Sequence, residues 1–126
     1  RKLYENGQLS ERELVEALAP THIYVNKILE LCDKGLVKAC ANITGGGIFG
    51  NISRVIPDGL RADIDKAKIP VQPIFDKLLA LVGEEEAYRT FNMGVGMCII
   101  AENDKVEDIL NSCKEYGAFV MGEITD

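Results

Sequence analysis

The stretch Asn42-Ile43-Thr44-Gly45-Gly46-Gly47-Ile48-Phe49-Gly50-Asn51-Ile52-Ser53-Arg54 places three consecutive glycines between an apolar run and a possible helix. It predicts a strand, a glycine turn and a helix start, which together offer backbone N–H groups to an anion. Thr44 precedes the turn, and Asn51 and Arg54 follow it three residues apart. We interpret the stretch as a binding site for a phosphate ester. The alternative is a glycine turn that binds no ligand. The spacing matches neither a P-loop nor G-x-G-x-x-G.

Length and charge narrow the class of protein. A chain of 126 residues fits one domain with a sizeable core. With 14 Lys+Arg against 20 Asp+Glu, the net charge of −6 argues against a general nucleic-acid binder. No apolar run approaches the ~20 residues needed to span a membrane, and the first residues do not resemble a signal peptide. The four cysteines form no Cys-x-x-Cys pair, so we expect buried reduced thiols and a cytoplasmic protein.

Apolar spacing predicts helices and strands in alternation. Ser10 and Glu13 form a capping box ahead of a helix that Pro20 ends. Further helices are predicted at about 24–34, 51–56, 73–82, from 84 onward and 103–116. Strands are predicted at 36–43, 60–65, 95–101 and 118–124. We therefore expect an α/β (α+β) sandwich in which helices cover a mixed β-sheet, with residues 1–126 forming a single domain.

A second glycine cluster, Gly94 and Gly96, stands at the start of a predicted strand. Glycines there cost stability, which indicates either a close approach to a ligand or another strand, or a β-bulge. Arg89 and Asn92 add a cation and an amide just ahead of them. If the two clusters face each other, they line one polar pocket. The candidate contacts are Thr44, Gly45, Gly46, Gly47, Asn51, Arg89, Asn92 and Gly94.

The usual sets of catalytic residues are absent from the chain. His22 is the only histidine, and a surface or capping role explains it better than catalysis. Glu84-Glu85-Glu86 is read as a solvated helix start rather than a metal site. Asp63 and Asp65 share a strand face, but nothing nearby completes a Mg²⁺ site. We assign no catalytic residue and no metal ligand.

Four motifs in order resemble the C-terminal domain of the aminoimidazole ribonucleotide synthetase family, also called phosphoribosylformylglycinamidine cyclo-ligase. They are Pro20-Thr21-His22-Ile23-Tyr24-Val25, the stretch from Asn42 to Pro57, Pro73-Ile74-Phe75, and the stretch from Tyr88 to Met97. The resemblance covers about residues 18–126.

This resemblance implies a step of purine biosynthesis. Such enzymes use ATP with Mg²⁺ to activate the formyl oxygen of formylglycinamidine ribonucleotide, and an internal nitrogen then closes the imidazole ring. It also implies a homodimer whose ATP site lies mainly in an N-terminal domain that this chain lacks. We therefore expect a C-terminal, substrate-side domain, slightly truncated at its front edge and inactive in isolation. The missing leading strand would leave a sheet edge exposed to another copy.

Three positions depart from the family pattern. His22, Asn42 and Ile69 stand where many members have Arg, His and Trp respectively. Asn42 cannot titrate, so no acid–base role is expected there. The alternative function is a ligand-binding or interaction domain of the same fold without catalysis. A further alternative is a related ATP-dependent enzyme such as selenophosphate synthetase or thiamine-monophosphate kinase.

Overall fold

The computed structural model describes all of residues 1–126, and its first third is helical. Helices α1 (Lys2–Glu5), α2 (Glu11–Ala17) and α3 (Val25–Asp33) precede any strand. The predicted capping box is confirmed, because the Ser10 hydroxyl accepts from the Glu13 N–H and the Glu13 carboxylate accepts from the Ser10 N–H. These mutual bonds satisfy two donors that a helix start leaves free.

Four short strands form two separate ladders. β1 (Ala39–Asn42) pairs antiparallel with β3 (Met97–Ile100), and β2 (Arg61–Ile64) pairs antiparallel with β4 (Gly122–Thr125). The predicted α/β class is confirmed, but the single mixed sheet is replaced by two antiparallel pairs with no bond between them. Each strand has four residues, fewer than its apolar run, because only those residues find a partner.

Four more helices complete the chain: α4 (Gly47–Ile52), α5 (Pro73–Val82), α6 (Glu84–Thr90) and α7 (Val106–Ser112). α5 spans the predicted residues, beginning at Pro73, and Gly83 with φ 86° follows it. The helix predicted at 51–56 is wrong in its bounds, because α4 starts at the third glycine and ends at Ile52. The helix predicted at 103–116 is divided into α7 and two flanking 3₁₀ turns.

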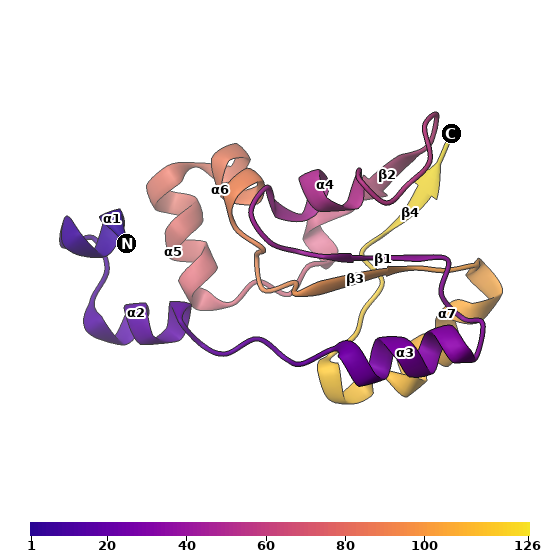
Figure 1. The fold of residues 1–126 in the computed structure, drawn as a ribbon. Coiled ribbons are helices and arrows are strands. Elements are labelled where there is room, and N and C mark those ends of the chain that lie inside the picture. The colour runs from indigo at the N-terminus through magenta and orange to yellow at the C-terminus, as the bar shows by residue number, and fades with distance from the viewer.

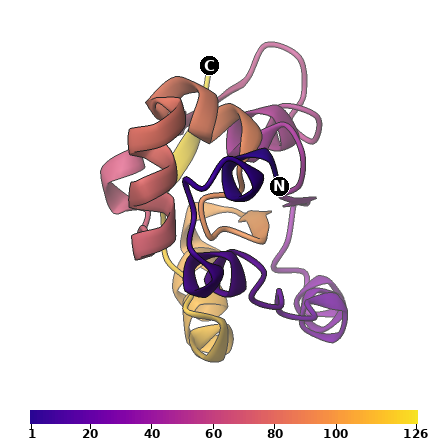
Figure 2. The same cartoon turned by 90° about the vertical axis from the view of Figure 1, so that its left-hand side faces the viewer.

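Helices lie on both sides of the β1–β3 ladder (Figures 1 and 2). α4, α5 and α6 lie on one side, and α3 and α7 lie on the other. Leu31 of α3 packs against Ile109 and Cys113 beside α7, forming a small satellite core. None of the helices combines the length and the apolar character that crossing a membrane would require.

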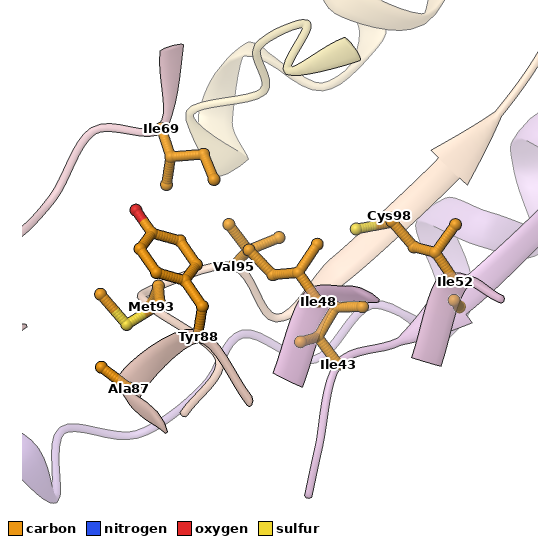
Figure 3. Packing of buried hydrophobic residues seen from close by; sticks show 10 residues of the cluster. Ile43, Ile48, Ile52, Ile69, Ala87, Tyr88, Met93, Val95 and Cys98 are labelled. Carbon is orange, nitrogen blue, oxygen red and sulfur yellow. The ribbon is translucent and has the colours of Figure 1, made fainter. Parts of the chain in front are cut away.

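The main core joins the glycine turn to the β1–β3 ladder (Figure 3). Its ten buried residues are Ala41, Ile43, Ile48, Ile52, Ile69, Ala87, Tyr88, Met93, Val95 and Cys98. Figure 3 shows Tyr88, Met93 and Ala87 gathered at one end of this cluster and Ile52 and Cys98 at the other. Each fully buried aliphatic side chain contributes about 1.5–3 kcal/mol, and the turn rests on the largest cluster of buried hydrophobic residues in the chain.

The apolar spacing of α3 predicts that Val25, Ile28, Leu29 and Cys32 share one buried face. Leu31 is fully buried, whereas Val25, Leu29 and Cys32 are exposed. The helix is rotated so that Leu31 meets α7, which spacing along one helix cannot foretell. All four cysteines are free, with Cys98 and Cys113 buried as expected, whereas Cys32 is exposed and Cys40 half-buried.

Candidate functional site

The glycine turn connects β1 to α4, as the sequence predicts. Thr44 is exposed, Gly45 and Gly46 form the turn, and Gly47 is the first residue of α4. Gly46 and Gly47 have φ values of 100° and 66°, a region that L-residues with side chains seldom occupy. The N–H of Gly47 donates to the carbonyl oxygen of Thr44 at 3.1 Å, which closes the turn.

The buried side chain of Asn51 stabilises this turn by hydrogen bonds. Its side chain is only 6% exposed, and its amide nitrogen donates to the carbonyl oxygens of Thr44, Gly45 and Gly47 at 3.3, 3.3 and 2.7 Å. An amide is well suited to this task because its two N–H donors can serve several carbonyl acceptors at once. The observed role of Asn51 is therefore positioning of the turn, and its predicted contact with substrate remains a prediction.

The third glycine is required by close packing against α6. A Cβ on Gly47 would collide with the carbonyl oxygen of Tyr88. At Gly45, by contrast, a Cβ would meet nothing within 4 Å. The start of α4 is thus pressed against the backbone of α6, and this contact brings Arg89 next to the turn.

A small hollow of about 270 Å³ opens at this junction. It is lined by Gly46, Phe49, Gly50, Lys66, Glu85, Tyr88 and Arg89. Arg89 is highly exposed, and its Nε lies 3.6 Å from Glu86, a distance beyond that of a good hydrogen bond. Two cationic side chains, Arg89 and Lys66, therefore stand beside this opening together with the carboxylate of Glu85, and the cations suit an anionic ligand.

Lys66 belongs to this hollow although its sequence position suggests only a loop. Its Nζ lies 4.8 Å from the centre of the Tyr88 ring and 2.7 Å from Glu84 Oε1. Burial raises the pKa of the Tyr88 phenol, and the charge of Lys66 partly opposes that rise. Lys66 lies in a 3₁₀ turn after β2, held by the Asp65 side chain, which accepts from the Ala67 N–H at 3.0 Å. In the sequence, the only indication of this turn is Asp65, which directly precedes Lys66-Ala67-Lys68.

The second glycine cluster is a compact turn ahead of β3. The Asn92 side-chain oxygen accepts from the Gly94 N–H at 3.0 Å, and Met93 adopts φ 53° while fully buried. A Cβ on Gly96 would collide with the hydroxyl of Tyr24. The close approach inferred from these glycines is therefore made to an aromatic side chain of the same chain.

The two glycine clusters border separate hollows. Asn92 and Gly94 line a larger groove of about 700 Å³, whereas Gly46 and Arg89 line the small hollow. Of the remaining candidates, Thr44, Gly45, Gly47 and Asn51 line neither. The structure thus brings Arg89 to the glycine turn but does not form the single shared pocket that the sequence suggested.

The three positions that depart from the family pattern do not line the small hollow. His22 is exposed and packs edge-on against Tyr116, with ring centres 5.4 Å apart. Ile69 is buried in the main core, and Asn42 is exposed where β1 ends. His, Cys, Asp and Glu side chains nowhere gather in a group that could hold a metal ion.

Comparison with protein families identifies the fold. The family model described as "AIR synthase related protein, C-terminal domain" matches residues 2–126. The chain belongs to this family. The resemblance inferred from the four motifs is confirmed, and it extends across nearly the whole chain.

Relatives of the family are similar along most of this chain. Phosphoribosylformylglycinamidine cyclo-ligase of Caldanaerobacter subterraneus subsp. tengcongensis is 46% identical over 114 residues, covering 86% of this chain and 33% of its own length. The enzymes of that name from Clostridium perfringens and Caldicellulosiruptor saccharolyticus are 42% and 41% identical, covering 86% and 98% of this chain. They are covered over 34% and 37% of their own lengths. The chain therefore spans about a third of these relatives.

Proposed function

We propose that this chain is the C-terminal part of a phosphoribosylformylglycinamidine cyclo-ligase, which converts formylglycinamidine ribonucleotide to aminoimidazole ribonucleotide in purine biosynthesis. The observation that carries the proposal is an identity of 41–46% to enzymes of that name along 86–98% of the chain. This level of identity across a whole domain favours the cyclo-ligase over a non-catalytic module or another ATP-dependent enzyme.

In this proposal the domain binds the ribonucleotide and does not itself carry the phosphoryl transfer. The hollow at the glycine turn takes the phosphate ester, with Arg89 and Lys66 supplying positive charge and Gly46 allowing close approach. Charge-assisted hydrogen bonds of this kind are about twice as strong as neutral ones. Asn92 and Gly94, which line the separate larger groove, are the proposed contacts to the amide-rich end of the substrate.

In this proposal Arg89, Lys66 and Tyr88 orient the substrate, and none of the three acts as a base. Arg89 and Lys66 are cationic at neutral pH. The raised pKa of Tyr88 keeps its phenol protonated, so the phenol can donate a hydrogen bond but cannot accept a proton. Asn42 does not titrate.

In this proposal ATP and Mg²⁺ bind mainly to the part of the longer protein that lies outside this chain. Their chemistry is activation of the formyl oxygen by phosphoryl transfer. No group of His, Cys, Asp or Glu in this chain fits a metal ion, so no step is assigned to Mg²⁺ here. We further propose that the complete protein is a cytoplasmic homodimer.

An assay of ADP release with formylglycinamidine ribonucleotide tests the proposal. The full-length protein should turn over, and the 126-residue chain alone should show no turnover. Turnover by the isolated chain would overturn the assignment of ATP to another domain. A full-length protein that consumes ATP with selenide or thiamine monophosphate instead would overturn the assignment of the substrate.

A further inference from the structure

The glycine turn has a third cation beside it, to which the proposed function gives no role. A Cβ on Gly46 would lie 3.9 Å from Nη2 of Arg54. Gly46 also lines the small hollow, together with Arg89 and Lys66. The guanidinium of Arg54 therefore stands next to the same turn residue as the two cations of the hollow.

The local fold directs Arg54 toward the turn. Just after α4, the N–H of Arg54 donates to the carbonyl oxygen of Asn51 at 3.3 Å, so the chain keeps turning in a helical sense. Residues three apart on such a turn share one side, and helical side chains lean toward the N-terminal end. The amide nitrogen of Asn51 is accordingly 3.8 Å from the same Cβ position on Gly46. Ile52, only 3% exposed in the main core, anchors the backbone that carries Arg54.

Arg54 is the one cation of this group without a carboxylate partner. The Nζ of Lys66 lies 2.7 Å from Oε1 of Glu84. The Nε of Arg89 lies 3.6 Å from Oε2 of Glu86. Arg54 is exposed and forms no ion pair. An anion can therefore bind Arg54 without first displacing a carboxylate, whereas at Lys66 it competes with Glu84.

The charge balance around the turn also depends on Arg54. Lys66 and Arg89 supply two positive charges, and the run Glu84-Glu85-Glu86 supplies three negative ones. Glu85 lines the hollow itself. A phosphate monoester carries a charge of about −1.5 to −2 at pH 7 and is repelled by surroundings of net negative charge. The unpaired guanidinium of Arg54 removes that local excess.

We propose that Arg54 is a further substrate-binding residue of this site, and that its guanidinium binds the phosphate group held at the glycine turn. The group is a phosphate dianion, either a ribonucleotide ester or free phosphate, and the choice of the ester rests on the proposed function. A planar guanidinium donates two N–H groups to two phosphate oxygens at once, so Arg54 orients the phosphate as well as neutralising it. Its exposed side chain reaches the phosphate from beside Gly46.

Chemical labelling of arginine tests this contact without relying on the reaction. Phenylglyoxal is applied to the full-length protein with and without ribose 5-phosphate or inorganic phosphate, and mass spectrometry measures the labelling rate of each arginine. At about ten times its Kd a ligand fills about nine sites in ten, so labelling of Arg54 should slow about tenfold. Arg12, on exposed α2, is the control and should be labelled at one rate throughout. The probe that protects at the lower concentration identifies the source of the phosphate group.

Comparing Arg54 with Arg89 separates this inference from the proposed function. Protection of Arg89 without protection of Arg54 would overturn the role of Arg54 and leave the hollow as the phosphate site. Protection of neither arginine, or equal protection of Arg12, would overturn both the role of Arg54 and the phosphate site. The identity of the substrate is tested separately by ADP release with formylglycinamidine ribonucleotide, so a failure there leaves the labelling result intact.

Two substitutions in the full-length protein give an independent test. Arg54→Ala should raise the KM for formylglycinamidine ribonucleotide by roughly tenfold or more and leave the KM for ATP unchanged. Arg54→Lys keeps the charge but loses the paired N–H groups, so its KM should lie between those of Arg54→Ala and wild type. The Tm of both variants should stay near that of wild type, because the side chain is exposed. A wild-type KM for Arg54→Ala, or a KM that rises only together with a fall in Tm, would show that Arg54 does not bind the substrate.

Discussion

Gly47 lies directly against the main-chain carbonyl oxygen of Tyr88, so close that a Cβ on Gly47 would collide with it. This contact fixes the start of α4 to the end of α6, two elements that are separated by β2 and α5 along the chain. Because Arg89 follows Tyr88, the same contact sets a guanidinium beside Gly46. The glycine therefore assembles the candidate phosphate site by backbone packing.

Replacing Gly47 should be far more harmful than replacing Gly45. Gly47→Ala combines a φ of 66° with a clash against backbone, and should cost about 3 kcal/mol or more of unfolding free energy. Gly45→Ala introduces a methyl group into open space and should stay within about 1 kcal/mol of wild type. Urea denaturation of both variants measures the difference. Equal stabilities would contradict the packing described for the turn.

Asn51 should be needed for its amide N–H groups rather than for its size. Asn51→Asp sets a carboxylate against three carbonyl oxygens in a buried site and should cost about 2–4 kcal/mol. Asn26→Asp, at an exposed position of α3, is the control and should change stability by about 0.5 kcal/mol or less. Thermal unfolding of the two variants should separate them, and matching melting curves would remove Asn51 from its positioning role.

Arg89 should affect substrate use without affecting the fold. In the full-length protein, Arg89→Ala should lower kcat/KM for formylglycinamidine ribonucleotide by roughly tenfold or more, as the loss of a charge-assisted bond suggests. Asn92→Ala should lower it similarly, but it also removes the acceptor for the Gly94 N–H and so should reduce Tm. Arg12→Ala, on exposed α2, is the control. Wild-type kinetics for Arg89→Ala would exclude the hollow as the phosphate site.

Acid should weaken the contact between α2 and α5. Lys77 bonds Glu13 at 2.6 and 2.7 Å, and with Ser10 it lowers the pKa of Glu13 from 4.5 to about 2. A lowered carboxyl pKa stabilises the folded state above pH 4.5, and this contribution is lost as pH falls from 4.5 toward 2. Glu13→Gln should therefore flatten the decline of Tm across that window. A variant that declines as steeply as wild type would show that the pair is not linked to folding.

The cysteines should differ sharply in reactivity. Burial raises the pKa of the Cys98 thiol to about 12, so almost none is thiolate at pH 8, whereas Cys32 is exposed on α3. A thiol reagent should modify Cys32 first and Cys98 only on unfolding. Mass spectrometry of partly labelled chain assigns the sites, and Cys32→Ser should remove the fast phase. Early labelling of Cys98 would contradict its place in the main core.

Local features were predictable because their causes lie within a few residues. The Ser10–Glu13 capping box, Pro73 at the start of α5 and the turn at Gly45–Gly46 each depend on neighbours in sequence. The family could also be inferred from short motifs, since their residue types and order are written in the chain. By contrast, the start of α4 was misplaced because its first residue depends on the distant contact with Tyr88.

The sequence by itself determined the α/β class, the glycine turn and the family. Only the tertiary structure decided that Lys66 lies with Arg89 beside the turn and that the strands form two ladders. It also decided that the Asn51 amide donates its hydrogen bonds to the carbonyl oxygens of the turn. The physical reason is that hydrophobic burial has no direction along the chain: helices rotate and strands pair wherever apolar surface is covered best. The apolar pattern of the sequence indicates which side chains are buried, and the packing of distant segments decides which residues bury them.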